Sequence, residues 1–171
     1  MRVTRELPAT VRIIVEEQVA VGMATLGDLY LVNADGEPFK KLESEDVLDL
    51  PLLTGVDRDT YVQDPRGTAA RFRDGLALAH AYEASGAEKR ARLSEVRLVR
   101  EGRVVVTENG QEIRFADGPA EDALMRLFKV RSELSHRGLV AQTIYLDNRA
   151  RPDRVTVKLK EIDVRVASAS E

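Results

Sequence analysis

Cysteine is absent from this sequence, which excludes disulfide bonds, thiolate metal sites and a cysteine nucleophile. Histidine is scarce, because only His80 and His136 are present and neither takes part in a metal-ligand pattern. Adjacent carboxylates such as Glu16 and Glu17 have no histidine or glycine-rich phosphate loop beside them, so we interpret them as solvated surface. The sequence therefore offers no candidate catalytic residues, no cofactor and no metal site.

Long hydrophobic runs are missing as well. No apolar stretch approaches the roughly 20 residues that cross a bilayer, and residues 1–6 lack the apolar core of a signal peptide. Taken literally, these absences predict a cytosolic chain. The composition, 43% hydrophobic and 32% charged over 171 residues, is that of one soluble globular domain with a real core. The net charge of −3 mixes both signs without a basic stripe, so we expect no nucleic-acid partner.

Alternating patterns predict strands in the N-terminal third. Residues 11–15 alternate and predict one strand. A hairpin follows, with one arm at 29–32, an Asp-Gly turn at Asp35-Gly36 and Phe39 on the returning arm. Residues 50–53 predict a further short apolar strand.

The middle of the chain predicts two helices around a meander. The first helix follows Pro65-Arg66-Gly67 and runs to about Ala84 with apolar residues on one face. Three strands are then expected at Glu95–Arg100, Arg103–Glu108 and Gln111–Ala116. The last two are joined by Asn109-Gly110, the strongest two-residue hairpin signal. The second helix runs to about His136, with Pro119 near its first position. One face of this helix is shared by Leu124, Leu127, Phe128, Arg131 and Leu134.

The C-terminal part predicts a strand at 143–146 and a long final strand from Arg154. In the final strand, apolar residues alternate at Val155, Val157 and Leu159. The alternation then resumes one residue out of step at Ile162, Val164 and Val166. A shift of this kind indicates a β-bulge near Lys160-Glu161. The whole pattern predicts an α+β fold, in which a mainly antiparallel curved β-sheet carries two main helices.

Four segments carry a resemblance to a known family: residues 29–39, Leu50-Pro51-Leu52-Leu53-Thr54-Gly55, residues 3–11 with Glu16-Glu17, and Ile144-Tyr145-Leu146-Asp147-Asn148-Arg149. The first two resemble the opening of the extracytoplasmic β-domain of the FtsQ/DivIB family of bacterial cell-division proteins. The third resembles the last strand of that family's POTRA domain, and the fourth its Tyr-x-Asp-Leu-Arg segment. The chain departs from the family pattern at Leu7, where an aromatic residue is usual, and in lacking the aromatic residue that some members carry in the terminal strand.

The resemblance implies a domain organisation and a location. Residues 1–22 would be the C-terminal remnant of a POTRA domain, including a POTRA-derived strand, residues 23–166 the β-domain, and residues 167–171 a flexible tail. Family members are single-pass proteins of the inner membrane with this domain on the periplasmic side. We therefore expect this chain to be a piece of such a protein with an added Met1, and prefer this location to the cytosol.

The resemblance also implies a non-enzymatic scaffold of the division septum that binds FtsB and FtsL type partners. Binding would occur by β-strand addition at the C-terminal sheet edge. The residues expected to contact the partner are Arg149, Ala150, Arg151, Arg154, Val155, Thr156, Val157, Lys158, Leu159, Arg100 and Arg103. The arginines and Lys158 would recognise an acidic partner segment, and Arg100 or Arg103 would reinforce it if they lie beside the same edge.

Three other interpretations remain open from sequence. The charges on the final strand can simply keep an edge soluble, which is common. A POTRA-bearing secretion or outer-membrane biogenesis factor would also work by strand addition, although it normally shows repeated POTRA units or a membrane barrel. An enzyme is the third alternative, and it would need a pocket with convergent polar groups that the sequence does not indicate.

Overall fold

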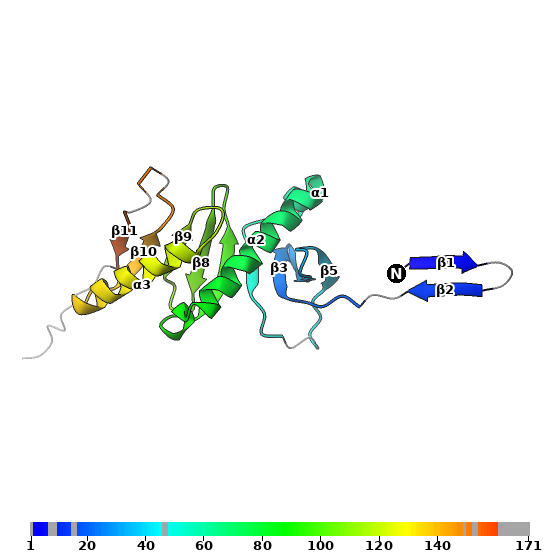
Figure 1. Cartoon of the computed structure of the whole chain (residues 1–171), viewed down its shortest axis with the longest axis horizontal. Helices are drawn as coiled ribbons and strands as arrows, with labels where there is room; N and C mark the ends of the chain where they lie inside the picture. Colours follow the sequence, from blue (N-terminus) through cyan, green and yellow to red (C-terminus); the bar gives the residue numbers. More distant parts are fainter. Residues whose placement is uncertain are drawn as a thin grey trace, which may run out of the picture.

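The computed structural model describes residues 2–6, 10–14, 17–45, 48–148, 150–151 and 154–160. At the N-terminus, β1 (Arg2–Glu6) and β2 (Thr10–Ile14) pair as an antiparallel hairpin. The helices and strands are labelled in Figure 1. The strand expected at 11–15 corresponds to β2, and residue 15 lies outside the described residues.

The described residues form a second, nine-stranded sheet in the order β11-β10-β9-β8-β7-β6-β3-β4-β5. Its strands are β3 (Gly22–Leu26), β4 (Asp28–Val32), β5 (Pro38–Lys41), β6 (Leu52–Thr54), β7 (Leu93–Leu98), β8 (Arg103–Thr107), β9 (Glu112–Phe115), β10 (Ala141–Tyr145) and β11 (Thr156–Leu159). Neighbouring strands are antiparallel except at β3–β6, β6–β7 and β9–β10, which are parallel. The predicted α+β class with a mainly antiparallel sheet is confirmed.

Both predicted helices are present, and they provide crossovers between parallel strands. Helix α2 (Pro65–Ala84) connects β6 to β7, and α3 (Glu121–His136) connects β9 to β10. Helix α2 begins earlier than expected, because Asp64 caps it by accepting a hydrogen bond from the Gly67 N–H at 2.9 Å. Helix α3 begins later, so Pro119 precedes its N-cap residue instead of occupying its first turn.

Strand β3 and two short helices, α1 (Arg58–Gln63) and the 3₁₀ helix η1 (Ala87–Lys89), were not predicted. Strand β3 has the sequence GMATL, and its buried positions include Gly22 and Ala24, so its hydrophobic alternation is weak. Helix α1 contains no fully buried residue, and Tyr61 packs against the core only in part. Its N-cap is Asp57, whose carboxylate accepts a hydrogen bond from the Thr60 N–H at 2.7 Å.

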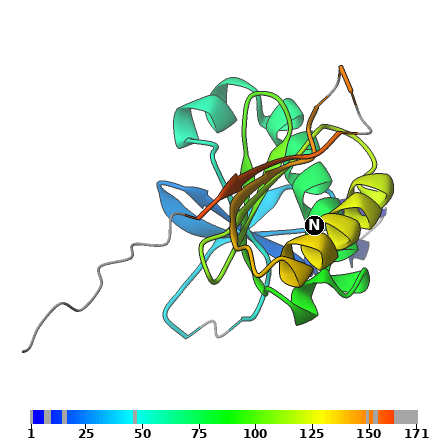
Figure 2. The same cartoon turned by 90° about the vertical axis from the view of Figure 1, so that its left-hand side faces the viewer.

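The core lies between the helices and one face of the nine-stranded sheet, and both long helices cover that face (Figure 2). The helices contribute large buried side chains, among them Phe72, Leu78, Tyr82, Leu124 and Leu127. The strands contribute Leu53, Val96, Val105, Ile113, Phe115 and Ile144 to the same cluster. Burial of this apolar surface is the main driving force for docking the helices.

The predicted turn at Asp35-Gly36 joins β4 to β5 and packs against α2. Asn33 shapes it, because its side-chain oxygen accepts hydrogen bonds from the backbone N–H groups of Asp35 at 3.0 Å and Glu37 at 2.9 Å. Gly36 has a φ of +79°, and a Cβ built there would lie 2.0 Å from the Ala69 carbonyl oxygen. The position therefore requires glycine for its backbone angle and for its distance from the helix.

We predict that Gly36→Ala destabilises the fold by more than about 3 kcal/mol, because the left-handed angle costs about 1–2 kcal/mol and the helix backbone must also move. Gly110→Ala is the matched control, since Gly110 has a φ of +76° and nothing within 4 Å of an added Cβ. The control isolates the backbone angle and is expected to cost about 1–2 kcal/mol. Urea denaturation of both variants measures the difference, and equal losses would contradict the close contact with α2.

Arg103 on β8 joins the sheet to α2 from a buried position. Its side chain is 3% exposed and forms an ion pair with Asp74 at 3.0 Å. The same guanidinium donates to the carbonyl oxygens of Asp74 at 3.2 Å, Ala116 at 2.7 Å and Gly118 at 2.5 Å. One charged group thus satisfies acceptors from α2 and from the segment that leads into α3.

We predict that Arg103→Met lowers the free energy of unfolding by about 3 kcal/mol, because it leaves buried carbonyl oxygens and Asp74 without their donor. Arg100→Met, at an exposed position three residues away, is the control and is expected to change stability by less than about 0.5 kcal/mol. Chemical denaturation monitored by circular dichroism compares the two. A small loss in Arg103→Met would show that the buried ion pair contributes little.

Candidate partner-binding edge

Strand β11 lies at one end of the sheet order, and within the described residues β10 is its only neighbour. Figure 2 shows this strand in front, at the border of the sheet. The backbone groups on its other side meet no strand of the described chain, so they are available for pairing with an added strand. The pairing is irregular between Ala141 and Thr143 of β10, whereas residues 161–166, which include part of the predicted bulge, lie outside the described residues.

The side chains of the final strand alternate between the core and solvent. Val155 and Val157 are partly buried and pack against the core, whereas Thr156 and Lys158 are exposed. Leu159 follows the apolar phase but remains 42% exposed. The inward residues fix the register of β11 on β10, and the outward residues lie on the solvent face of the sheet beside the free backbone edge.

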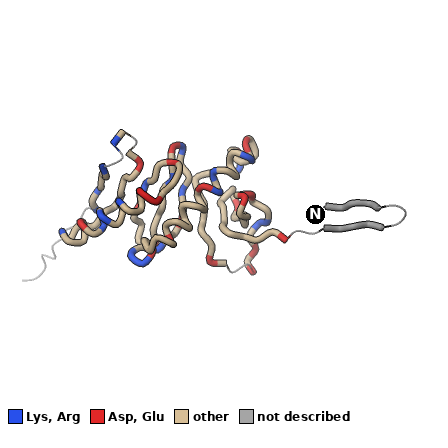
Figure 3. The backbone as a smooth tube through the Cα atoms, viewed as in Figure 1, with Lys and Arg blue, Asp and Glu red and all other residues tan. Residues whose placement is uncertain are grey.

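Basic residues are concentrated around this edge. Arg151, Arg154, Lys158 and Lys160 are exposed along the loop and strand (Figure 3). Two hydrogen bonds join described residues of the loop: the Arg151 N–H donates to the Asn148 side chain and the Arg154 N–H to the Arg151 carbonyl oxygen, both at 3.0 Å. The edge therefore offers a row of cations to an acidic partner.

The predicted contact residues are only partly brought together. Ala150, Arg151, Arg154 and Val155 precede the strand, and Thr156–Leu159 form β11, which therefore begins two residues later than the predicted start at Arg154. Arg149 lies outside the described residues. Their involvement in partner binding stays a prediction.

Arg100 and Arg103 do not lie beside the final strand, which corrects the expectation that they reinforce it. Arg100 is exposed in the turn between β7 and β8, and β8 is separated from β11 by β9 and β10. Arg103 is buried and already paired with Asp74. The error has a physical reason, because turn residues are evident from sequence but the lateral order of strands depends on the whole topology.

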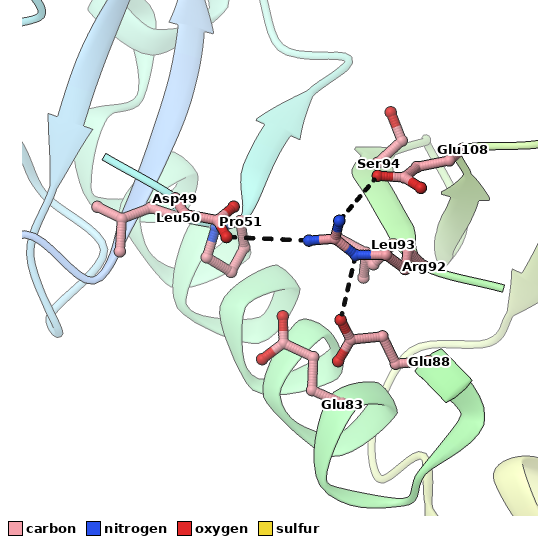
Figure 4. A pocket seen from close by; sticks show the side chains of 9 residues that line it. All are labelled: Asp49, Leu50, Pro51, Glu83, Glu88, Arg92, Leu93, Ser94 and Glu108. Carbon is pink, nitrogen blue, oxygen red and sulfur yellow. Dashed lines mark ion pairs between the residues drawn. The ribbon is translucent and has the colours of Figure 1, made fainter. Parts of the chain in front are cut away.

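A cavity of about 470 Å³ lies where β7 begins, between the segment before β6, the end of α2 and the residue after β8, and it is strongly acidic (Figure 4). Four carboxylates line it, from Asp49, Glu83, Glu88 and Glu108. Arg92 lies among them, at 3.9 Å from Asp49, 3.7 Å from Glu88 and 3.6 Å from Glu108. These ion pairs are partly exposed and long, so each stabilises the fold only weakly.

Glu83 lies beside this cluster without an ion pair to Arg92 in Figure 4. Partial burial raises the pKa of its carboxyl group, and the nearby Glu88 raises that pKa further. A raised carboxyl pKa alone does not identify Glu83 as a catalytic residue. In the part of the chain that the structure describes, no group of three or more His, Cys, Asp or Glu side chains could hold a metal ion. None of the helices in the described ranges is long and apolar enough to cross a membrane.

Comparison with known proteins gives one family. The model of the family "Cell division protein FtsQ/DivIB, C-terminal" matches residues 22–166. The chain is 48% identical over 159 residues to "Cell division protein FtsQ" of Myxococcus fulvus, covering 93% of this chain and 56% of the relative. It is 35% identical over 159 residues to the protein of the same name from Anaeromyxobacter sp., covering 92% of this chain and 54% of the relative.

A third relative, "Cell division protein FtsQ" of Geobacter sp., is 29% identical over 160 residues, covering 92% of this chain and 57% of the relative. The chain thus spans about half the length of the curated relatives it matches. The family match extends from β3 through the described final strand, so it includes the whole nine-stranded sheet and both long helices. This chain belongs to the FtsQ/DivIB family of cell division proteins, and its residues 22–166 match the C-terminal model of that family.

Proposed function

We propose that this chain is the binding domain of a division-septum scaffold and that its edge strand β11 accepts a strand from a partner protein. The observation that carries the proposal is a terminal strand whose second side meets no described strand, flanked by exposed basic residues. Membership of the family supplies the cellular context, since the relatives are named cell division proteins. The proposed role is assembly and involves no catalysis.

Strand addition suits the chemistry of this edge. An incoming strand would pair with the unsatisfied N–H and C=O groups of β11, and these main-chain bonds would provide affinity for any extended segment. Specificity would come from side chains that point outward, namely Thr156 and Lys158. Arg151 and Arg154 in the preceding loop would add attraction for an acidic segment and speed its association.

The proposed partners are FtsB and FtsL type division proteins, as the family resemblance implies. In this proposal the whole protein is anchored in the inner membrane and the domain lies on the periplasmic side. Residues 1–22, which include the β1–β2 hairpin, would be the end of a preceding POTRA domain. Residues 23–166 would be the unit that binds the partner.

We predict saturable binding of the extracytoplasmic part of an FtsB–FtsL pair from the same organism, measured by calorimetric titration. Arg154→Glu combined with Lys158→Glu is expected to weaken binding at least about tenfold, which is about 1.4 kcal/mol, because it replaces two exposed cations at the proposed edge by anions. Lys129→Glu, at an exposed position on α3, reverses one charge away from the edge; it is the control for a general effect of charge reversal and should leave binding nearly unchanged.

Two results would contradict the proposal. One is the absence of binding by a chain whose circular dichroism shows that it is folded. The other is binding that the double variant and the Lys129→Glu control weaken equally, since this would indicate general electrostatic attraction instead of a site at β11.

A further inference from the structure

A groove runs along helix α2, beside the segment that leads into β6, and we call it the α2 groove. Its volume is about 500 Å³. One wall is a stripe of α2 whose members recur at helical spacing: Arg73, Leu76, Ala77, His80 and Glu83. The segment before β6 supplies the other wall: Asp49, Leu50 and Pro51. The groove therefore follows α2 for about three turns.

Much of the lining of the α2 groove is apolar. Leu76 and Leu50 are only half-buried there, Ala77 is exposed, and Val21 is 38% exposed. Leu48, which precedes the lining residue Asp49, is 42% exposed as well. Apolar side chains that are exposed together around one groove are typical of a surface that another molecule covers.

The α2 groove continues into the acidic cavity around Arg92. The two hollows share four lining residues: Asp49, Leu50, Pro51 and Glu83. In Figure 4, Asp49 and Pro51 lie on one side of the acidic cavity and Glu108 on the other, with Arg92 between them. The described lining of the two hollows together holds four carboxylates and only two guanidinium groups, so negative charge dominates where the groove meets the cavity.

Glu83 lies where the two hollows meet, and its carboxyl group responds to the acidic surroundings. Partial burial raises its pKa, the nearby Glu88 raises that pKa further, His80 lowers it in part, and Asp49 raises it. A cation that entered beside Glu83 would lower this pKa and relieve the repulsion among the carboxylates. Residues 46–47 lie outside the described ranges, and the sequence there adds no cation.

The length and the charge of the α2 groove indicate which molecule it fits. Arg73 and Glu83 are ten positions apart on the helix, which corresponds to about 15 Å. An extended chain covers this distance with about five residues. Aliphatic side chains would fill the apolar part, and a lysine or arginine would meet the carboxylates at the Glu83 end.

We propose that the α2 groove binds a short extended segment of a second protein, in which aliphatic residues lie within about five positions of a lysine or arginine. This surface is separate from the candidate edge, because β7, β8, β9 and β10 lie between β6 and β11 in the sheet. The two surfaces also differ in charge, since the exposed residues around β11 are basic and attract acidic segments. The proposal therefore does not rest on strand addition at β11.

The first experiment titrates the folded chain with the peptide acetyl-Leu-Val-Ser-Arg-Lys-amide and follows the chain by NMR. Saturable shifts are expected at the backbone amides of Leu50, Ala77 and Glu83, together with a lower pKa of the Glu83 carboxyl group. Two control peptides test the chemistry of the occupant. Acetyl-Ser-Gly-Ser-Arg-Lys-amide lacks the aliphatic residues and acetyl-Leu-Val-Ser-Glu-Asp-amide lacks the cations, and each should bind at least about tenfold more weakly.

The second experiment repeats the titration with variants at exposed positions. Ala77→Lys places a cation in the groove and should weaken binding of the basic peptide about fivefold, whereas Ala70→Lys makes the same change on α2 outside the lining and should leave binding unchanged. Glu83→Gln should weaken binding about threefold. Its control is Glu101→Gln, which removes the same charge from the exposed turn after β7.

Three results would overturn the proposal. One is a spectrum that the basic peptide leaves unchanged. Another is equal binding by the peptide without aliphatic residues, because this would show only a general attraction of cations to the acidic cavity. The third is an equal effect of Ala77→Lys and Ala70→Lys, which would place the binding site away from the groove. The titration uses no FtsB–FtsL pair, so its result is independent of the proposed function of β11.

Discussion

The close packing of α2 against the sheet is the constraint on which the rest of the structure depends. A Cβ built at Gly75 would lie 2.9 Å from the end of the Leu53 side chain and 3.1 Å from that of Leu98, so any larger residue there would require these leucines to shift. The turn at Gly36 meets the same helix from the side. Phe72, Leu78 and Tyr82 then fill the space on both sides of this contact, and their dense packing holds the parallel strands β6 and β7 together.

This arrangement separates the two signs of charge. The acidic side chains near η1 gather around Arg92, whereas Arg131, one helix away, lies in a cavity without a carboxylate in the described chain. Tyr82 lies between these groups, and burial raises the pKa of its hydroxyl group although Arg131 opposes that shift. Exposed basic residues lie around β11 at one end of the sheet. Within the described residues this strand pairs only with β10. The free edge and the basic residues beside it are consistent with recognition of an acidic, extended segment.

Local sequence signals predicted the elements better than their arrangement. The turns at Asp35-Gly36 and Asn109-Gly110 and both long helices were evident, because turn chemistry and helical periodicity act over a few residues. Strand β3 was missed because two of its three buried positions are Gly22 and Ala24, and α1 because it is short and contains no fully buried residue.

The candidate site was predictable to a similar extent. The final strand and its basic residues were evident in the sequence, and the structure places this strand at an edge. The burial of Arg103 and Arg131 was not evident, since their acceptors are mostly backbone and side-chain oxygens from distant segments. One signal was available: Arg131 occupies an otherwise apolar face of α3, which a solvated arginine would not require.

Amide hydrogen exchange of the chain with and without an FtsB–FtsL pair would show whether a partner strand pairs with β11, because it reports backbone pairing strand by strand. We expect slower exchange at the amides of Thr156–Leu159 on binding and no change at β5, the opposite edge of the sheet. Protection of β5, or of a helix surface, with unchanged exchange in β11 would contradict strand addition at this edge.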